Sequence, residues 1–188
     1  MARQLGASRV VGSAGGSHKT KKLLDVFGYD AAVDHRLGDL PGQLAQAAPE
    51  GIDVYLDAVG GDHRAAIGAI RPGGRIAMVG AISGYNATRP APGPDNLFRA
   101  AAREVTLRGM LVSSHFDLFP EWIGTAAARL ADGTLRTEET VTDGIERAAE
   151  ALLGVLSGAD TGKMLVRPGA EHGAPKAART GPEAGQRA

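Results

Sequence analysis

The residues best suited to chemistry lie in the stretch Gly80-Ala81-Ile82-Ser83-Gly84-Tyr85-Asn86, which follows an apolar run. This stretch brings backbone NH groups, a hydroxyl, a phenol and an amide into one loop. Upstream, Asp57-Ala58-Val59-Gly60-Gly61 also ends an apolar run at small residues, which let a flat or anionic group approach the backbone. In an open α/β sheet a nucleotide binds at such strand ends. The two stretches together predict a nucleotide site.

The composition indicates a globular domain without a general attraction for polyanions. Of 188 residues, 43% are hydrophobic and 22% are charged, and 21 basic side chains balance 21 acidic ones. This balance gives no electrostatic case for binding nucleic acid or an anionic membrane. Any phosphate binding must therefore be local.

Several classes of site and location are excluded by residue types. The chain has no cysteine, which excludes a disulfide framework, thiolate zinc and a cysteine nucleophile. Its five histidines form no pair at metal-ligand spacing, so we expect no metal site. The segment Met1–Gly6 lacks the apolar core of a signal peptide, and no window approaches the roughly 18 apolar residues of a membrane span. We therefore expect a cytoplasmic protein.

Short β-branched runs alternate with helical patterns, which predicts βαβ units and a parallel sheet. The expected strands are 9–13, 31–34, 52–57, 75–79, 106–112, 139–143 and 163–167. The expected helices are 17–27, 40–48, 63–70, 118–131 and 145–156. We expect Ser17 to cap the first helix, Gly28 to end it, and Arg71-Pro72-Gly73-Gly74 to form a turn.

The first residues predict the end of a helix. A nucleotide-binding α/β domain normally opens with a strand, a glycine-rich turn and a helix whose N-terminus faces the phosphates. Residues 2–7 instead resemble last helical turns that end at glycine, so the first strand would precede Met1. In the order 3-2-1-4-5-6 that strand is central, and its absence would expose the facing edges of strands 9–13 and 52–57. We therefore expect an α/β fold, a Rossmann-like doubly wound parallel sheet that lacks its first strand, with a C-terminal α+β segment.

The motifs together resemble the C-terminal portion of a known family. They are similar to the zinc-independent, NADP-dependent medium-chain dehydrogenases/reductases, in the branch of prostaglandin reductases, leukotriene B4 12-hydroxydehydrogenase, alkenal double-bond reductases and curcumin reductase. The resemblance runs from Ala2 to Arg167 and rests on the order of Gly15-Gly16-Ser17-His18-Lys19, Phe27-Gly28-Tyr29-Asp30, Asp57 to Gly61, Gly80 to Asn86, and Gly162-Lys163.

This resemblance implies an activity and a division of the chain. The activity is hydride transfer from NADPH to the carbon-carbon double bond of a small α,β-unsaturated ketone or aldehyde, in a homodimer that pairs through the strand near 106–112. Residues 1–117 would form part of an NADP-binding Rossmann domain, and 118–167 would return to the catalytic domain. Residues 168–188 have no apolar periodicity, which predicts a disordered tail.

Lys19 is the candidate for the adenosine end of the cofactor. It lies in the first turn of an expected helix just past a strand end, where a cation can pair with a 2′-phosphate, as the matching lysine of the family does. The alternative is a solvated lysine, since Lys21 and Lys22 are also present. We favour the phosphate interpretation because no acidic residue follows the strand at 13–16, where an NAD-binding protein would hold the ribose 2′-hydroxyl.

The resemblance implies a larger set of cofactor-binding residues: Ser13, Gly15, Lys19, His35, Val59, Gly60, Gly80, Ala81, Ile82, Ser83, Tyr85, Met110, Leu111, Val112 and Gly162. Tyr85 is also the candidate catalytic acid, because a phenol beside a developing enolate can donate a proton; packing and cofactor contact are its alternative roles. The alternative for the Gly60-Gly61 pair is an ordinary turn, and for Met110 to Val112 an ordinary buried strand.

Four positions depart from the family's pattern. Ala58 stands where the family has asparagine, and His35 stands where it has a tyrosine near the phosphates. His115 replaces an aromatic residue near the substrate. Asp160 replaces an asparagine, and its carboxylate would repel a nearby phosphate or enolate.

Two further classes of protein are compatible with the sequence. Other nucleotide-fold enzymes are excluded, because the chain has neither the Tyr-x-x-x-Lys of short-chain dehydrogenases nor a P-loop. The alternatives to a reductase domain are a non-catalytic cofactor-binding or scaffold module, and a product of a misplaced start codon. We expect the isolated chain to have little or no reductase activity, because the family's N-terminal domain forms the opposite wall of the substrate cleft.

Overall fold

The computed structural model describes residues 1–169, so the predicted tail at 168–188 lies almost wholly outside the described residues. The strands are β1 (Val11–Ala14), β2 (Ala31–Asp34), β3 (Ile52–Asp57), β4 (Ile70–Met78), β5 (Thr106–Gly109), β6 (Glu139–Asp143) and β7 (Lys163–Arg167). The α-helices are α1 (Ser17–Asp25), α2 (Leu40–Ala47), α3 (His63–Ala69), α4 (Leu97–Ala102), α5 (Phe119–Ala131) and α6 (Ala148–Ser157). The 3-10 helices are η1 (Arg3–Leu5), η2 (His35–Leu37), η3 (Ile82–Gly84), η4 (Val112–Leu118) and η5 (Ile145–Arg147).

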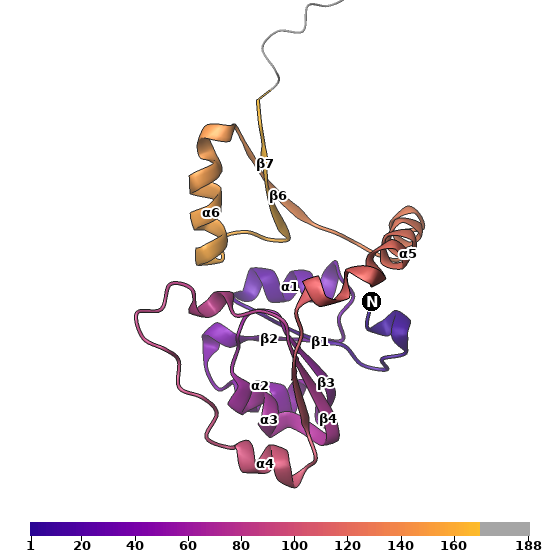
Figure 1. Ribbon diagram of the computed structural model, residues 1–188, viewed down its shortest axis with the longest axis vertical. Helices are drawn as coiled ribbons and strands as arrows, with labels where there is room; N and C mark the ends of the chain where they lie inside the picture. Colours follow the sequence, from indigo (N-terminus) through magenta and orange to yellow (C-terminus); the bar gives the residue numbers. More distant parts are fainter. Residues whose placement is uncertain (170–188) are drawn as a thin grey trace, which may run out of the picture.

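Every strand pair in the described part of the chain is parallel, and the strands form three sheets. β1 pairs with β2, β4 lies between β3 and β5, and β6 pairs with β7. The first two sheets reproduce a doubly wound order whose central strand is missing between β1 and β3, as predicted. In Figure 1, α6 with β6 and β7 forms a separate unit beyond α1.

The ends of the first helices follow from local hydrogen bonds. Asp39 and Asp62 cap α2 and α3, because their carboxylates accept hydrogen bonds from backbone NH groups of the first helical turn. The prediction that Ser17 caps α1 was wrong. The capping residue is Gly16, which provides no side chain, and Ser17 already lies inside the helix. Gly28 follows the helix with a φ of 66°, a conformation that glycine adopts without strain.

The predicted turn at residues 71–74 is instead part of β4. α3 ends one residue earlier than expected, and Ile70 pairs with Ile52 before the register shifts, so that Arg75 pairs with Val54. The four residues 71–74 therefore stand opposite Asp53 alone. A Cβ on Gly74 would lie 2.7 Å from Cγ2 of Ile70, so glycine is required where the strand bulges.

The strand predicted for residues 106–112 ends at Gly109. The NH of Met110 still donates to the carbonyl of Met78 over 2.9 Å, but β4 itself ends at Met78. Without a neighbouring strand to continue the ladder, Leu111 leaves the sheet and Val112 begins η4. The prediction that Met110, Leu111 and Val112 are strand residues was therefore wrong.

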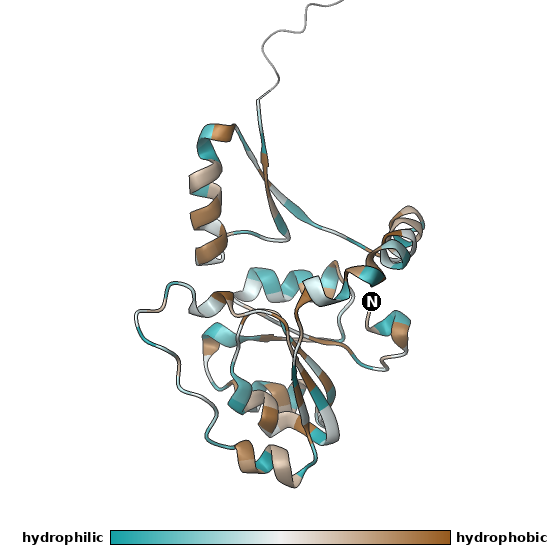
Figure 2. Cartoon of the chain, viewed as in Figure 1, coloured by the Kyte–Doolittle hydropathy of each residue, from teal (hydrophilic) through white to brown (hydrophobic). Residues whose placement is uncertain are grey.

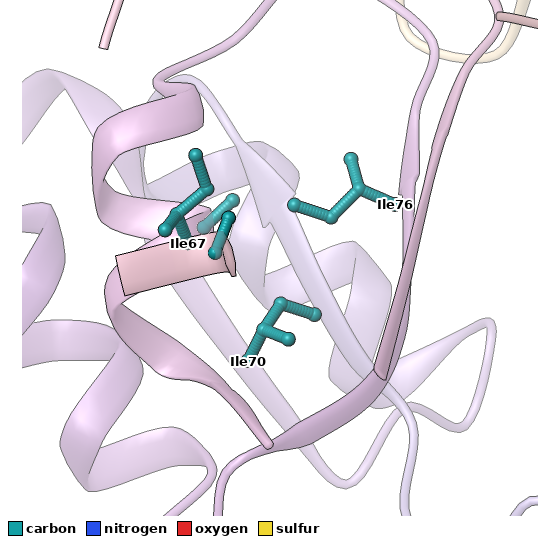
Figure 3. Close-up of a cluster of buried hydrophobic side chains, with 5 residues drawn as sticks. Ile67, Ile70 and Ile76 are labelled. Atoms are coloured by element: carbon teal, nitrogen blue, oxygen red, sulfur yellow. The ribbon is translucent and has the colours of Figure 1, made fainter. Parts of the chain in front are cut away.

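The core consists of two clusters that share α3. One holds Ala66, Ile67, Ile70, Ile76 and Ala100, and its isoleucines converge in Figure 3. The other contains Val33, Leu44, Ala47 and Ala65, against which Val11 of β1 and Ile52 of β3 pack. α2 and α3 therefore hold the two sheets together although β1 and β3 share no ladder.

The C-terminal unit is less well covered. Leu152 and Leu153 of α6 are 60% and 67% exposed, and Figure 2 shows hydrophobic segments along this helix. None of the helices in residues 1–169 combines the length and the apolar character needed to cross a membrane.

Ile67→Ala should lower the free energy of unfolding by about 2–5 kcal/mol, because it empties a fully buried position. Urea unfolding followed by circular dichroism measures the effect. Phe98→Ala is the control: Phe98 is 85% exposed, so its loss should change stability by less than about 0.5 kcal/mol. Equal effects of the two substitutions would contradict this placement of the core.

Candidate functional site

The two strand ends identified from sequence lie against each other. The Oγ of Ser83 donates to the carbonyl of Gly60 over 2.8 Å, and the NH of Ser83 donates to the carbonyl of Val59 over 2.9 Å. A Cβ on Gly80 would lie 2.3 Å from the carbonyl oxygen of Ala58, so the close approach requires glycine there. The structure therefore brings these predicted residues together at one edge of the sheet.

Asp57 organises the first of these loops. Its side chain is 2% exposed and accepts hydrogen bonds of 2.9–3.1 Å from the NH groups of Val59, Gly60 and Gly61. Nε2 of His63 lies 2.7 Å from Oδ2 of Asp57. The predicted turn at Gly60-Gly61 is thus closed by a carboxylate. The NH groups of Val59 and Gly60 already donate to Asp57. A ligand beside this turn therefore has to contact other atoms of these two residues.

The same contacts set the ionisation of Asp57 and its neighbour. Burial alone would raise the pKa of Asp57, but the hydrogen bonds from Val59, Gly61, Gly60 and His63 outweigh it and hold the pKa below its ordinary value. The pKa of Tyr55 is raised, first by burial and then by the negative charges of Asp57 and Asp62. Asp57 is therefore a charged structural acceptor at neutral pH.

The loop from Gly80 to Asn86 keeps several groups available. The NH groups of Ser83, Gly84 and Tyr85 donate within the two loops, whereas those of Ala81 and Ile82 have no acceptor in the described part of the chain. Tyr85 is 72% exposed, and its phenol has no hydrogen-bond partner within residues 1–169. Two backbone donors and one phenol are thus free at this strand end.

A cluster of basic side chains lies at the ends of β1 and β2. Nζ of Lys19 donates to the carbonyl of Gly158 over 2.8 Å. A Cβ on Gly15 would lie 2.7 Å from Nε of Arg36 and 3.0 Å from Nε2 of His35. A Cβ on Gly158 would lie 3.5 Å from Nη2 of Arg36 and 3.8 Å from Nζ of Lys19. We call Lys19, His35 and Arg36 the basic cluster.

The basic cluster differs from an ordinary charged surface. Lys21 forms an ion pair with Asp25, and Lys22 forms one with Glu138. Among the described residues, no carboxylate lies within ion-pair distance of Lys19 or Arg36. The alternative of a solvated lysine run therefore fits Lys21 and Lys22 better than Lys19.

The loop that carries the basic cluster is fixed by Asp34. This buried carboxylate accepts hydrogen bonds from the NH of Gly16 over 2.9 Å and from the NH of Arg36 over 3.0 Å. These bonds hold its pKa below the ordinary value and join the ends of β1 and β2. Ser13 is exposed near the end of β1 beside this loop.

Arg36 and Gly158 were missed by sequence reasoning. A basic residue directly after His35, at the end of a predicted strand, was a usable signal for Arg36. Gly158 gave no comparable signal, because its contact with Lys19 joins residues 139 positions apart.

The remaining residues discussed from the sequence lie in different parts of the structure. Gly162 has a φ of 82°, and a Cβ there would lie 2.1 Å from the carbonyl oxygen of Glu138, so the junction of β6 and β7 already requires glycine. Met110 lies beside Met78, next to the loop that begins at Gly80. His115 breaks the regular geometry of η4, with φ −137° and ψ 27°. Asp160 is half-buried, two residues after Gly158.

An open cavity of about 660 Å³ lies along α6 and the strands β6 and β7. It is lined by Asn86, Thr142, Glu150, Ala151, Leu153, Gly154, Leu156, Ser157, Ala159 and Met164. Ser157 and Ala159 flank Gly158 beside the basic cluster, and Asn86 ends the Gly80 loop. Within residues 1–169, no group of three or more histidine, cysteine, aspartate or glutamate side chains is arranged to hold a metal ion.

Comparison with known proteins matches residues 1–132 to the family model described as zinc-binding dehydrogenase. The chain is 34% identical over 170 residues to the NADPH-dependent curcumin reductase of Escherichia coli K12, covering 87% of this chain and 49% of that protein. It is 35% identical over 159 residues to (+)-pulegone reductase of Mentha piperita, covering 84% and 46% of the two chains.

A solved structure shares the fold. The crystal structure of CurA from Vibrio vulnificus in complex with NADPH matches with a TM-score of 0.80 and 32% identity, over 88% of this chain and 51% of that one. The chain therefore spans about half the length of the curated relatives it matches.

Asp57→Asn should lower the free energy of unfolding at pH 7 by about 1–3 kcal/mol, because it weakens a buried charged acceptor of several hydrogen bonds. A carboxylate with a lowered folded pKa stabilises the fold above its unfolded pKa of about 3.9 and loses that contribution as pH falls through the folded value. The difference between wild type and variant should therefore shrink below about pH 4.

Urea unfolding at a series of pH values measures this difference. Asp53→Asn is the matched control on the same strand, since Asp53 is exposed and pairs only with exposed Arg71, and it should cost less than about 1 kcal/mol. A difference for Asp57→Asn that does not change with pH would contradict the assigned charge.

Proposed function

Because the chain belongs to the zinc-binding dehydrogenase family, we propose that it forms the NADP-binding part of a reductase that acts on the carbon-carbon double bond of α,β-unsaturated ketones or aldehydes. The basic cluster, whose side chains form no ion pair within residues 1–169, is the observation that carries the NADP part of this proposal. The names of two relatives support the substrate class, since curcumin and pulegone are both α,β-unsaturated ketones.

The basic cluster fits the 2′-phosphate of NADP. A phosphate that carries nearly two negative charges is favoured where cations converge. The nearby carboxylate of Asp34 is already bound by the NH groups of Gly16 and Arg36, and in the described part of the chain it forms no ion pair with the cluster's side chains. Lys19 approaches from α1, and Arg36 and His35 approach from η2, so the three groups can contact different oxygens. An NAD-binding protein would place a carboxylate at the end of β1, and residues 13–16 contain none.

The Gly80 loop fits the nicotinamide end. The free NH groups of Ala81 and Ile82 can donate to a carboxamide oxygen, and bound NADPH would supply a hydride. Reduction of an enone leaves an enolate that needs a proton, and the exposed phenol of Tyr85 can donate it. The glycines at 60 and 80 bring the two loops close enough to form one wall of the site.

The family's name refers to zinc, and the described residues do not fit that metal. The chain has no cysteine, and residues 1–169 contain no group of three or more metal-binding side chains. We assign no step to a metal ion.

Other features complete the proposal. Residues 1–117 form the nucleotide-binding part and 118–167 belong with the catalytic domain of the whole reductase. We also propose a cytoplasmic homodimer that pairs near 106–112, where the edge of β5 away from β4 has no strand partner among the described residues.

A non-catalytic cofactor-binding or scaffold module is the second candidate. Ala58 offers no side-chain amide, and Asp57 occupies the NH groups of Val59 and Gly60. These features reduce the polar contacts available to the nicotinamide end while leaving the basic cluster intact. Such a module would bind NADPH without turning over a substrate.

Lys19→Ala and Arg36→Ala should each weaken NADPH binding by about tenfold, which corresponds to about 1.4 kcal/mol, and leave NADH binding within about twofold. Only NADPH carries the 2′-phosphate. Fluorescence titration with both nucleotides makes the measurement. Lys21→Ala is the control on the same helix, because Lys21 pairs with Asp25. Equal losses for the two nucleotides, or no saturable binding by the unmodified chain, would contradict the cofactor proposal.

The isolated chain should show no enone reduction above background, because half of the relatives' length is outside it and water has open access to the Gly80 loop. The assay follows NADPH oxidation with an enone, after binding has been measured on the same sample. Robust turnover would show that these residues alone form a working site.

A further inference from the structure

The turn that carries His35 and Arg36 is not held in place by packing. All three residues of η2 are exposed, and Leu37 is 79% exposed. Gly38, which ends the turn, has a φ of 74°. Asp39 follows with a φ of 41°, a left-handed conformation that costs free energy in any residue other than glycine. The position of this turn therefore depends on hydrogen bonds, because apolar contacts do not fix it.

One side chain of α2 reaches both ends of the turn. Oε1 of Gln43 accepts a hydrogen bond from the NH of Asp34 over 2.9 Å, and Nε2 of Gln43 donates to the carbonyl of Asp34 over 2.9 Å. The same Nε2 donates to the carbonyl of Gly38 over 2.7 Å. Asp34 is the residue that precedes η2, and Gly38 is the residue that follows it. A single amide therefore holds the turn at its beginning and at its end.

The helix that carries Gln43 is anchored in the core. Leu44 is 5% exposed and Ala47 is 8% exposed, and both belong to the cluster that contains Val33 of β2. Gln43 is half-buried between this anchored helix and the exposed turn. A side chain on a rigid element can fix the geometry of a neighbouring loop through hydrogen bonds. Gln43 thus ties η2 to the best-packed part of the nucleotide-binding region.

The bonds of Gln43 also bear on the arginine of the basic cluster. The carboxylate of Asp34 accepts the NH of Arg36 over 3.0 Å, so the main chain of Asp34 and that of Arg36 move together. Nε of Arg36 lies 2.7 Å from the position that a Cβ on Gly15 would take. Because an arginine binds a phosphate through directed hydrogen bonds, its guanidinium has to be placed accurately.

We propose that Gln43 is a positioning residue that sets the preference for NADPH over NADH, because it holds η2 and so places Arg36 for the 2′-phosphate. This inference rests on the cofactor proposed above. Gln43 contacts backbone groups of the turn and acts through Arg36. NADH lacks the 2′-phosphate, so its binding does not depend on how η2 is held.

The test replaces Gln43 with methionine, which has a similar length and no amide. Gln43→Met should weaken NADPH binding about fivefold and leave NADH binding within about twofold, as measured by fluorescence titration. Gln43→Asn keeps an amide but shortens its reach, and it should give the same selective loss where the methionine variant does not fold. Gln46→Met is the matched control, because Gln46 is exposed on the same helix, and it should change neither affinity.

A double-mutant cycle tests whether Gln43 acts through Arg36. In an Arg36→Ala background, Gln43→Met should change NADPH binding by less than about twofold, because the side chain that it positions is gone. The same loss in both backgrounds would show that Gln43 acts independently of Arg36 and would overturn the inference. An equal loss of NADPH and NADH binding would show a general structural role and would also overturn it.

Hydrogen exchange of the free chain provides a readout without cofactor. Gln43→Met should speed exchange at the NH groups of Asp34 and Arg36, whereas Gln46→Met should not. Unchanged exchange at Arg36 overturns the inference. If the unmodified chain binds neither nucleotide, the cofactor proposal fails and this inference fails with it. If the unmodified chain prefers NADPH and Gln43→Met keeps that preference, only this inference fails.

Discussion

The buried residue Asp57 holds the candidate site together. Its carbonyl oxygen accepts the NH of Val79 over 2.7 Å and that of Gly80 over 3.3 Å, which fixes where β4 leaves the sheet. Its carboxylate folds the following turn onto itself through the NH groups of Val59 to Gly61. One residue thus positions both loops, and Ser83 can then join them. The cost of burying this charge is offset because it is surrounded by donors.

The geometry of the two loops does not depend on a ladder between β1 and β3. β3, β4 and β5 share a ladder, and α3 packs its alanines and isoleucine against both core clusters. The ends of β3 and β4 therefore keep their geometry without a neighbour on the open side of β3. On the opposite face of β3, Val54 and Leu56 are exposed.

Sequence periodicity predicted the elements whose pattern is local. The bounds of β2, β3, β6 and β7 agree with the prediction, and α2 and α3 agree within one residue. Two of the errors in the strands arise where a neighbouring strand decides the outcome. β4 begins early because Ile70 finds Ile52, and β5 stops at Gly109 because β4 has ended. α4 was missed because it has only six residues and no side-chain cap.

Local chemistry also predicted part of the site. The approach of the two glycine-containing loops follows from parallel strands that end at one edge, and it was predicted. The capture of the Val59 and Gly60 NH groups by Asp57 was not predicted, although an aspartate that precedes a glycine pair is a common turn former. The contact of Lys19 with Gly158 depends on how α6 lies over α1, and no local pattern contains that information.

Under the proposed NADP assignment, the residues at the two ends of the candidate site offer different contacts. At the adenosine end, Arg36 and His35 lie over Gly15, so positive charge is available to a phosphate. At the nicotinamide end, Ala58 has no polar side chain, and the NH groups of Val59 and Gly60 are bound to Asp57. Binding energy from a phosphate acts equally on the resting and reacting states, whereas contacts at the nicotinamide orient the hydride. The proposed assignment therefore favours cofactor recognition over rate.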